Sequence, residues 1–252
     1  MEPPLALNSV TYKFVRNLAD IESEMPRPSS IIHAKEPPVG YPRVWKTFHT
    51  HFSPRKSEKQ IPMGVLYEAA VLFGTRFRMA NSFQGLRMNS GYADPTLKAY
   101  EALLGFSLTW SAMEQLWKVC EEKSCGRKGA MDQHTFFDSI FEQLGGRSVE
   151  SIIIDYRGNE SLHETLLKKI NSNNKLLRTG LEELYEGKNR NLRFLGSALR
   201  NAFTHGAFAA HTGGRPVSTA RICRRMRELL LATIEEVFEK WVHKTMEMEI
   251  DN

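Results

Sequence analysis

Apolar residues recur at intervals of three and four over most of the chain after Met63, which is the spacing of one face of an α-helix. The pattern predicts helices over residues 63–83, 94–124, 133–144 and 161–171, and within residues 189–210 and 218–249. Asp94 and Pro95 suit the N-cap and first turn of the second helix. Residues 149–156, VESIIIDY, are the one good strand candidate in the second half of the chain, although eight residues are too few to distinguish a strand from a helix. The last segment carries one apolar stripe, formed by Ile222, Met226, Leu229, Leu230, Thr233, Val237 and Trp241.

The first 62 residues differ from the rest of the chain because they contain nine of its eleven prolines. Proline lacks the backbone N–H that a helix needs, and it restricts the residue before it. We therefore predict an irregular arm with short strands at residues 9–15 and 43–49, packed through its aromatic residues. The expected fold class is all-α, with a Pro-rich N-terminal arm over residues 1–62 and a helical bundle over residues 63–252.

Charge and hydropathy narrow the classes of protein that remain. The chain has 252 residues, of which 41% are hydrophobic, and a formal net charge of +5. This mildly basic charge suits a nucleic-acid partner without requiring one. No signal-peptide pattern opens the sequence, and no apolar run approaches the roughly 18 residues of a transmembrane helix. We therefore expect a cytoplasmic chain that does not enter a membrane.

The sequence offers two weak metal-site patterns. Cys120 and Cys125 could supply half of a zinc site, but no second pair completes it, and the odd total of three cysteines indicates a reducing compartment. His49 and His51 would point the same way on a strand, yet no acidic or cysteine partner is near them in the sequence. We interpret them as structural residues and expect no metal and no cofactor.

The main chemical candidate is the segment LRNAFTHGAF, residues 199–208, which places Arg200, Asn201 and His205 within one predicted helix. Asn201 and His205 are four residues apart and share one flank. Arg200 lies about 140° away from His205 around an ideal helix. One isolated helix therefore does not bring these two side chains together. The core face of this helix is predicted to hold Leu192, Leu195, Leu199, Ala202 and Phe203.

The sequence ALRNAFTHG, on the penultimate long helical segment, resembles the signature of the HEPN family of small α-helical domains, many of which are ribonucleases. Arg200, Asn201 and His205 occupy the positions of the family motif. The earlier helix FSLTWSAMEQLWK is also similar to a HEPN helix, with Glu114 where many members carry a polar residue that faces the site. The resemblance covers about residues 95–245. The arm and the VESIIIDY segment have no counterpart in it.

This resemblance implies a metal-independent endoribonuclease that cleaves single-stranded RNA at a site shared by two protomers of a homodimer. His205 would exchange a proton with the ribose 2′-OH, and Arg200 would hold the phosphate oxygens. Asn201 would orient His205 or bind the ribose, and Glu114 would face the same site. The product would be a 2′,3′-cyclic phosphate. The family resemblance also implies a role in a toxin–antitoxin or antiviral defence system, with an antitoxin or regulatory protein as a partner.

A group of arginines precedes and opens the last predicted helix: Arg215, Arg221, Arg224, Arg225 and Arg227. Positive charge at a helix N-terminus opposes the helix dipole, so these residues are candidates for contacts with the RNA backbone. A solvated surface or salt bridges between helices would also explain them. His211, in the preceding loop, is a further candidate for the site.

Each candidate also has a structural explanation. His205 could be a hydrogen-bonded histidine at the edge of the core, and Arg200 a solvated helix residue. Glu114 could pair with Lys118, four residues further along the same helix. Trp110 and Trp117 fit a core position better than a platform for stacked bases. The alternative functions are a non-catalytic HEPN-like module that binds RNA or protein, and a regulator that holds a small ligand in the bundle.

Overall fold

The computed structural model describes residues 39–53, 61–86, 94–121, 133–144, 146–204 and 215–250. Every regular element in these residues is a helix, which confirms the all-α prediction. The strand predicted at residues 9–15 lies outside the described residues. Val39–Asn252 form one compact unit, so residues 39–53 of the expected arm belong to the same unit as the helices. None of the helices described is long and apolar enough to cross a membrane.

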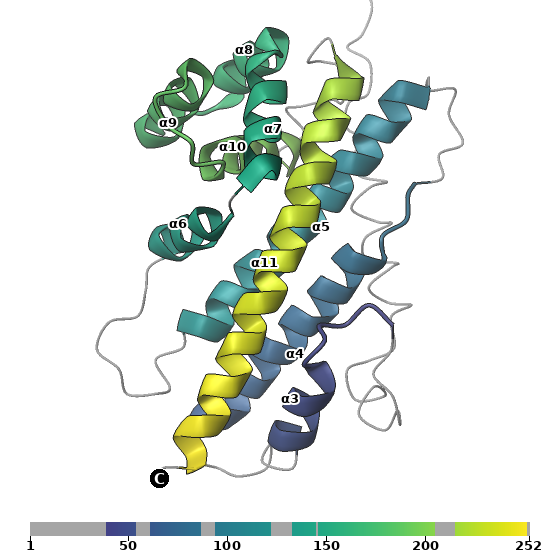
Figure 1. Ribbon diagram of the computed structural model, residues 1–252, viewed down its shortest axis with the longest axis vertical. Coiled ribbons are helices and arrows are strands. Elements are labelled where there is room, and N and C mark those ends of the chain that lie inside the picture. The colour runs from purple at the N-terminus through teal and green to yellow at the C-terminus, as the bar shows by residue number, and fades with distance from the viewer. Residues whose placement is uncertain are drawn as a thin grey trace, which may run out of the picture. The chain divides into compact units, whose positions relative to one another are not determined.

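Three long helices lie side by side and form the main core: α4 (Ile61–Ser82), α5 (Asp94–Glu121) and α11 (Pro216–Ile250), as Figure 1 shows. Phe73 of α4, Phe106 of α5 and Phe238 of α11 are fully buried. Arg227 of α11 donates to the carbonyl oxygens of Ala80 and Phe83, at 2.6 and 3.0 Å, where α4 ends. Its guanidinium therefore satisfies carbonyl groups that a helix end leaves unpaired.

The strand predicted at residues 43–49 is wrong, because this segment forms helix α3 (Trp45–Phe52). Trp45, Phe48 and Phe52 are buried at helical spacing. The Trp45 and Phe238 rings stack with centroids 6.3 Å apart, and those of Phe48 and Tyr67 with centroids 5.7 Å apart. The burial of these aromatic side chains on the long helices compensates for the short length of α3.

Five shorter helices pack beside the long ones: α6 (Gln133–Gln143), α7 (Gly146–Arg157), α8 (Glu160–Lys169), α9 (Lys175–Glu186) and α10 (Arg193–Thr204). The ambiguous VESIIIDY segment is thus part of a helix. Asn159 and Asn174 cap α8 and α9, since each side-chain oxygen accepts from a backbone N–H at 3.2 Å. Gly187, at φ +83°, ends α9 in the left-handed conformation that glycine adopts without strain.

Helices α7, α8 and α9 meet at a polar aromatic cluster. The buried Tyr156 hydroxyl lies 2.7 Å from His163 Nδ1, and the His163 ring stacks on Tyr185 with centroids 4.0 Å apart. Burial lowers the pKa of His163, which favours the neutral imidazole. Nδ1 of a neutral imidazole can accept a hydrogen bond from the Tyr156 hydroxyl. The neutral form that burial favours is therefore also the form that this hydrogen bond requires.

Helix α10 is held at close range on two sides. A Cβ atom added to Gly180 of α9 would overlap the Phe194 ring of α10. One added to Gly196 of α10 would lie 2.6 Å from Cζ3 of Trp110 on α5. An ion pair also holds α10 to α6. The side chain of Arg193 is only 8% exposed, and its Nε lies 2.8 Å from Oδ1 of Asp138. These contacts fix the position of α10, which carries the Arg200 segment.

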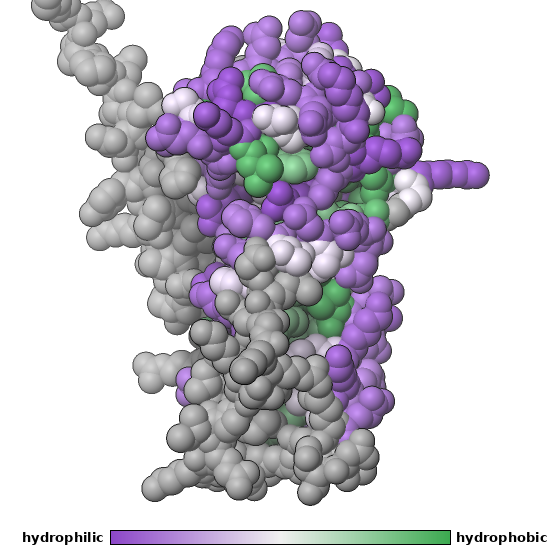
Figure 2. Space-filling model, turned by 90° about the vertical axis from the view of Figure 1, so that its left-hand side faces the viewer, coloured by the Kyte–Doolittle hydropathy of each residue, from purple (hydrophilic) through white to green (hydrophobic). Residues whose placement is uncertain are grey.

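The side of the protein in Figure 2 is hydrophilic over most of its described surface, with small apolar areas between the polar ones. The exposed large apolar side chains of the described residues include Ile154, Leu176 and Val217, each 62% exposed. Ile154 and Val217 line the same hollow.

Candidate functional site

The structure brings three of the four predicted catalytic residues together. Nη2 of Arg200 lies 3.0 Å from Oε1 of Glu114, which joins α10 to α5 in an ion pair. Nη1 of Arg200 donates to Oδ1 of Asn201 at 3.1 Å. The guanidinium is therefore bound on two of its nitrogens by residues that the sequence had already singled out.

Trp110 is a third partner of this group. Its indole Nε1 donates to Oε1 of Glu114 at 3.1 Å, the same oxygen that pairs with Arg200. Trp110 is 3% exposed, and its ring lies against Phe137 and Phe141 of α6, with centroids 5.4 and 5.9 Å away. A rigidly packed indole thus sets the direction of the Glu114 carboxylate, and the carboxylate sets the direction of Arg200.

Solvent can reach this group of side chains. The side chain of Arg200 is 31% exposed and that of Glu114 is 25% exposed. A guanidinium has five N–H donors, and the two polar contacts described here leave others for a ligand. A fixed, half-exposed guanidinium of this kind suits an anion with two oxygens, such as a phosphate diester.

The fourth predicted catalytic residue, His205, lies outside the described residues, as does His211. Helix α10, as described, ends at Thr204, one residue before His205. The core face predicted for this helix is confirmed at Leu192, Leu195, Leu199 and Ala202, which are buried, whereas Phe203 is only half-buried. Among the ion pairs of the described residues, Glu114 pairs with Arg200 and not with Lys118.

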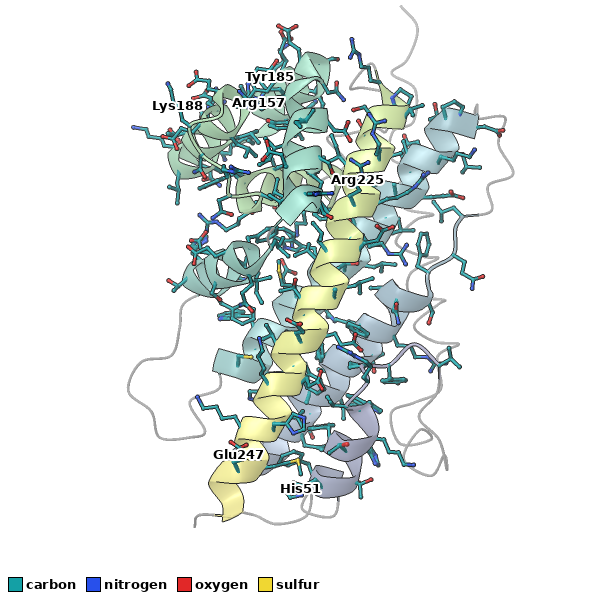
Figure 3. The ribbon with its side chains drawn as sticks, in the orientation of Figure 1. His51, Arg157, Tyr185, Lys188, Arg225 and Glu247 are labelled. Carbon is teal, nitrogen blue, oxygen red and sulfur yellow. The ribbon has the colours of Figure 1, made fainter. Side chains whose placement is uncertain are left out.

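Three of the predicted RNA-binding arginines, Arg215, Arg221 and Arg225, lie along the seam between α11 and α7. Arg215 donates to the Gly158 carbonyl oxygen at 3.0 Å. Arg221 and Arg225 both bind Oδ2 of Asp155, at 2.7 and 3.0 Å. Arg224 is exposed and makes no ion pair with another described residue. Figure 3 shows Arg225 where α7 lies beside α11. Salt bridges between helices therefore account for part of the arrangement, and much of the charge still faces solvent.

Sequence reasoning missed several polar residues of these sites. Asp155 was not recognised as the partner of two arginines, although it follows three isoleucines and ends the apolar run. Asn191 was missed as well; its side-chain amide donates to Asp138 at 2.9 Å, beside the buried Arg193. Trp110 was correctly placed in the core, but its hydrogen bond to Glu114 was not anticipated. The four-residue spacing of Trp110 and Glu114 was the only signal for that bond.

Metal chemistry has no obvious centre in the part of the chain described. No group of three or more His, Cys, Asp or Glu side chains there is arranged to hold an ion. His49 and His51 lie on helix α3, so the shared strand face considered for them does not exist. Burial raises the pKa of the Cys223 thiol to about 12, so this thiol is protonated near neutral pH.

The shared carboxylate oxygen leads to a prediction about stability. Trp110→Phe removes the indole N–H but keeps an aromatic ring between the two helices. We expect a loss of about 1 kcal/mol in the free energy of unfolding. Since Trp110 and Arg200 bind the same oxygen, Trp110→Phe and Arg200→Met should be non-additive by at least about 0.5 kcal/mol. Urea denaturation of the four proteins of this cycle measures the coupling. As a control, Trp110→Phe and the remote Lys168→Met should give additive losses. Additive losses for Trp110→Phe and Arg200→Met would contradict a shared carboxylate oxygen.

Comparison with known proteins supplies no further guide to this site: no family model, curated protein sequence or solved structure matches the chain.

Proposed function

We propose that this protein is a metal-independent endoribonuclease of the HEPN type, acting on single-stranded RNA through Arg200, Asn201, His205 and Glu114. The observation that carries the proposal is the grouping of Arg200, Asn201 and Glu114 at 3.0–3.1 Å on a half-exposed surface. These three residues are also the ones to which the resemblance to the HEPN family points. Their proximity supports the proposal, because it places a fixed guanidinium where a phosphate can reach it.

In the proposed reaction, the ribose 2′-OH attacks the adjacent phosphorus and the 5′-oxygen of the next nucleotide leaves. His205 takes the 2′-OH proton or protonates the leaving oxygen. Arg200 binds the non-bridging oxygens, whose negative charge grows in the transition state. Glu114 and Trp110 hold the guanidinium in advance, so less reorganisation is needed during the reaction. Asn201 orients His205 or binds the ribose.

The test of this function uses a labelled single-stranded RNA and the full-length protein. We expect cleavage in the presence of EDTA, products that end in a 2′,3′-cyclic phosphate, and loss of cleavage in Arg200→Ala. Arg190→Ala is the matched control, because it also removes an arginine that pairs with a glutamate, here Glu150 of α7. Cleavage abolished by EDTA and restored by magnesium would refute the mechanism. RNA binding without any cleavage would favour the non-catalytic module instead.

A further inference from the structure

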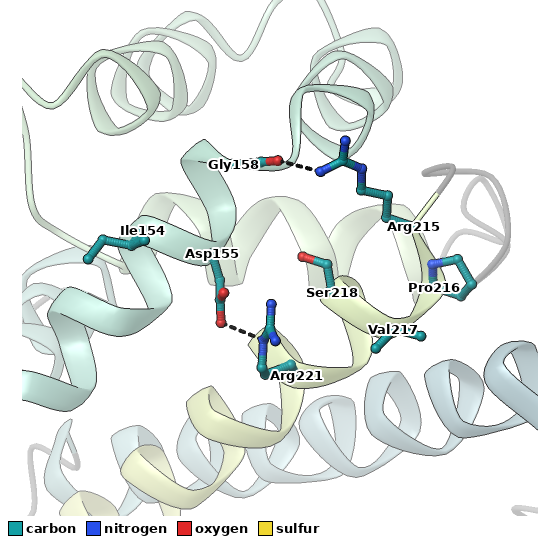
Figure 4. A pocket seen from close by; sticks show the side chains of 8 residues that line it. All are labelled: Ile154, Asp155, Gly158, Arg215, Pro216, Val217, Ser218 and Arg221. Carbon is teal, nitrogen blue, oxygen red and sulfur yellow. Dashed lines mark hydrogen bonds and ion pairs between the residues drawn. The ribbon is translucent and has the colours of Figure 1, made fainter.

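Helices α7 and α11 form a long polar seam. They pack antiparallel, because Asp155 of α7 meets Arg221 of α11, and Ser151, one turn earlier, meets Arg225, one turn later. Two hollows open along this seam. The first, with a volume of about 550 Å³, lies between the end of α7 and the first turns of α11 (Figure 4). The second, of about 450 Å³, lies between the start of α7 and residues 225–232.

The first hollow is lined in part by exposed apolar side chains, although exposed positions are usually polar. Ile154 and Val217 both line it, and each is 62% exposed. They are two of the five exposed large hydrophobic side chains among the described residues. They lie on different helices: Figure 4 shows Val217 on the first turn of α11, near Arg215, and Ile154 on α7, next to Asp155. This pairing of aliphatic and guanidinium groups suits a ligand that is both flat and anionic.

The seam as a whole carries excess positive charge. The linings of the two hollows include four arginines, namely Arg147, Arg215, Arg221 and Arg225, against two carboxylates, Asp155 and Glu228. The Asp155 carboxylate is only 15% exposed, and two guanidinium groups bind its Oδ2. The side chains of Arg221 and Arg225 are 51% and 40% exposed. One shielded carboxylate therefore holds two arginines in place without neutralising both.

We propose that the α7–α11 seam binds a single-stranded polynucleotide, with phosphates along the arginines and one base in the hollow between Ile154 and Val217. The 15 residues from Ser218 to Ala232 span about 21 Å of helix, enough for several nucleotides. Every base has an apolar face that can pack on such side chains without sequence preference. The identification of the strand as RNA rests on the proposed function. Arg147, Ile154 and Val217 are thereby added to the predicted RNA contacts.

Binding can be measured without cleavage by using a fluorescein-labelled 2′-O-methyl oligonucleotide, which has no free 2′-OH. The double variant Ile154→Ser/Val217→Ser should lower its affinity about tenfold with an unchanged dependence on salt, because no charge is altered. Leu176→Ser is the matched control, since Leu176 is also 62% exposed but lies on α9. It should bind like the wild type. An unchanged affinity in the double variant would overturn the base site.

The arginines are tested by the salt dependence. Arg147→Gln and Arg221→Gln should each lower affinity and reduce the slope of log affinity against log salt by about 0.7 per lost phosphate contact. Lys168→Gln on α8 is the control for the lost charge. Inorganic polyphosphate has phosphates but no bases. It should bind the Gln variants more weakly than the wild type, and the Ser double variant as tightly as the wild type.

Two other results would overturn parts of the account separately. Tighter binding of polyglutamate than of the oligonucleotide, lost in the same variants, would assign the seam to an acidic protein segment and overturn this proposal. Binding of the oligonucleotide at the seam with no cleavage of natural RNA would refute only the proposed catalysis.

Discussion

Mixing an Arg200→Ala protein with a His205→Ala protein should restore RNA cleavage that neither variant shows alone. Each variant is expected to lose about 100-fold to 10,000-fold in rate, the range for removal of a group that acts on the transition state. In a two-fold dimer whose sites combine Arg200 of one protomer with His205 of the other, the mixed dimer keeps one complete site. Random mixing should then recover about one quarter of the wild-type activity.

The reason to expect a composite site is geometric. On one ideal helix Arg200 and His205 lie about 140° apart, while a shared phosphate requires both within hydrogen-bonding distance. Glu114 binds Arg200 from within the same chain, so Arg200 is oriented before any partner arrives. The control mixes Arg200→Ala with the double variant Arg200→Ala/His205→Ala, which should stay inactive. Full activity in a protein that remains monomeric at the assay concentration would contradict the composite site.

The long helices were accessible from the sequence because their patterns are local and repeat many times. The predicted helix at residues 133–144 matches α6, and the segments at 63–83 and 94–124 match the described α4 and α5 closely. Helix α9 was missed, although Asn174 and Gly187 mark its ends. The prediction of a strand at residues 43–49 gives the neighbouring prolines more weight than the spacing of Trp45, Phe48 and Phe52. That spacing is helical, so the information was present.

The buried face of α11 shows a limit of pattern reading. In the first half of the predicted stripe Ile222, Met226 and Leu230 are buried, while Leu229 is only half-buried. Further along, the buried residues are Ile234, Phe238 and Val242, each one position later than the predicted Thr233, Val237 and Trp241. The helix first packs on α7 and then passes α3 and α4, so the direction of its core changes along its length. A single stripe assumes one constant direction.

The candidate site also has a part that the sequence predicts and a part that it does not. Arg200, Asn201 and Glu114 could be selected from sequence because a short motif and a resemblance pointed to them. Their shared partner Trp110 acts through packing on α6, and the pairing of Asp155 with Arg221 and Arg225 joins residues some 70 positions apart. Contacts of this kind depend on the tertiary arrangement of helices, which one sequence does not encode in any local pattern.

Gly196→Val should destabilise the protein by about 3 kcal/mol or more and abolish RNA cleavage as well. The Cβ of any residue at this position would lie 2.6 Å from Cζ3 of Trp110 and 3.1 Å from Cε of Met226. Trp110 cannot move aside freely, because Phe137 and Phe141 pack against its ring. Helix α10 must therefore shift away from α5, which lengthens the 3.0 Å contact between Arg200 and Glu114.

Two further variants separate this close contact from the general effect of valine in a helix. Ser197→Val introduces the same side chain at the next, half-exposed position, and should change the free energy of unfolding by at most about 0.5 kcal/mol. Gly196→Ala should be milder than Gly196→Val, since the gain of about 1 kcal/mol in helix propensity offsets part of the overlap. Thermal unfolding measures the series, with a decrease in Tm of roughly 6–12 °C expected for Gly196→Val. A Gly196→Val protein with wild-type Tm and cleavage would show that α10 does not need this close approach to Trp110 to hold Arg200 in place.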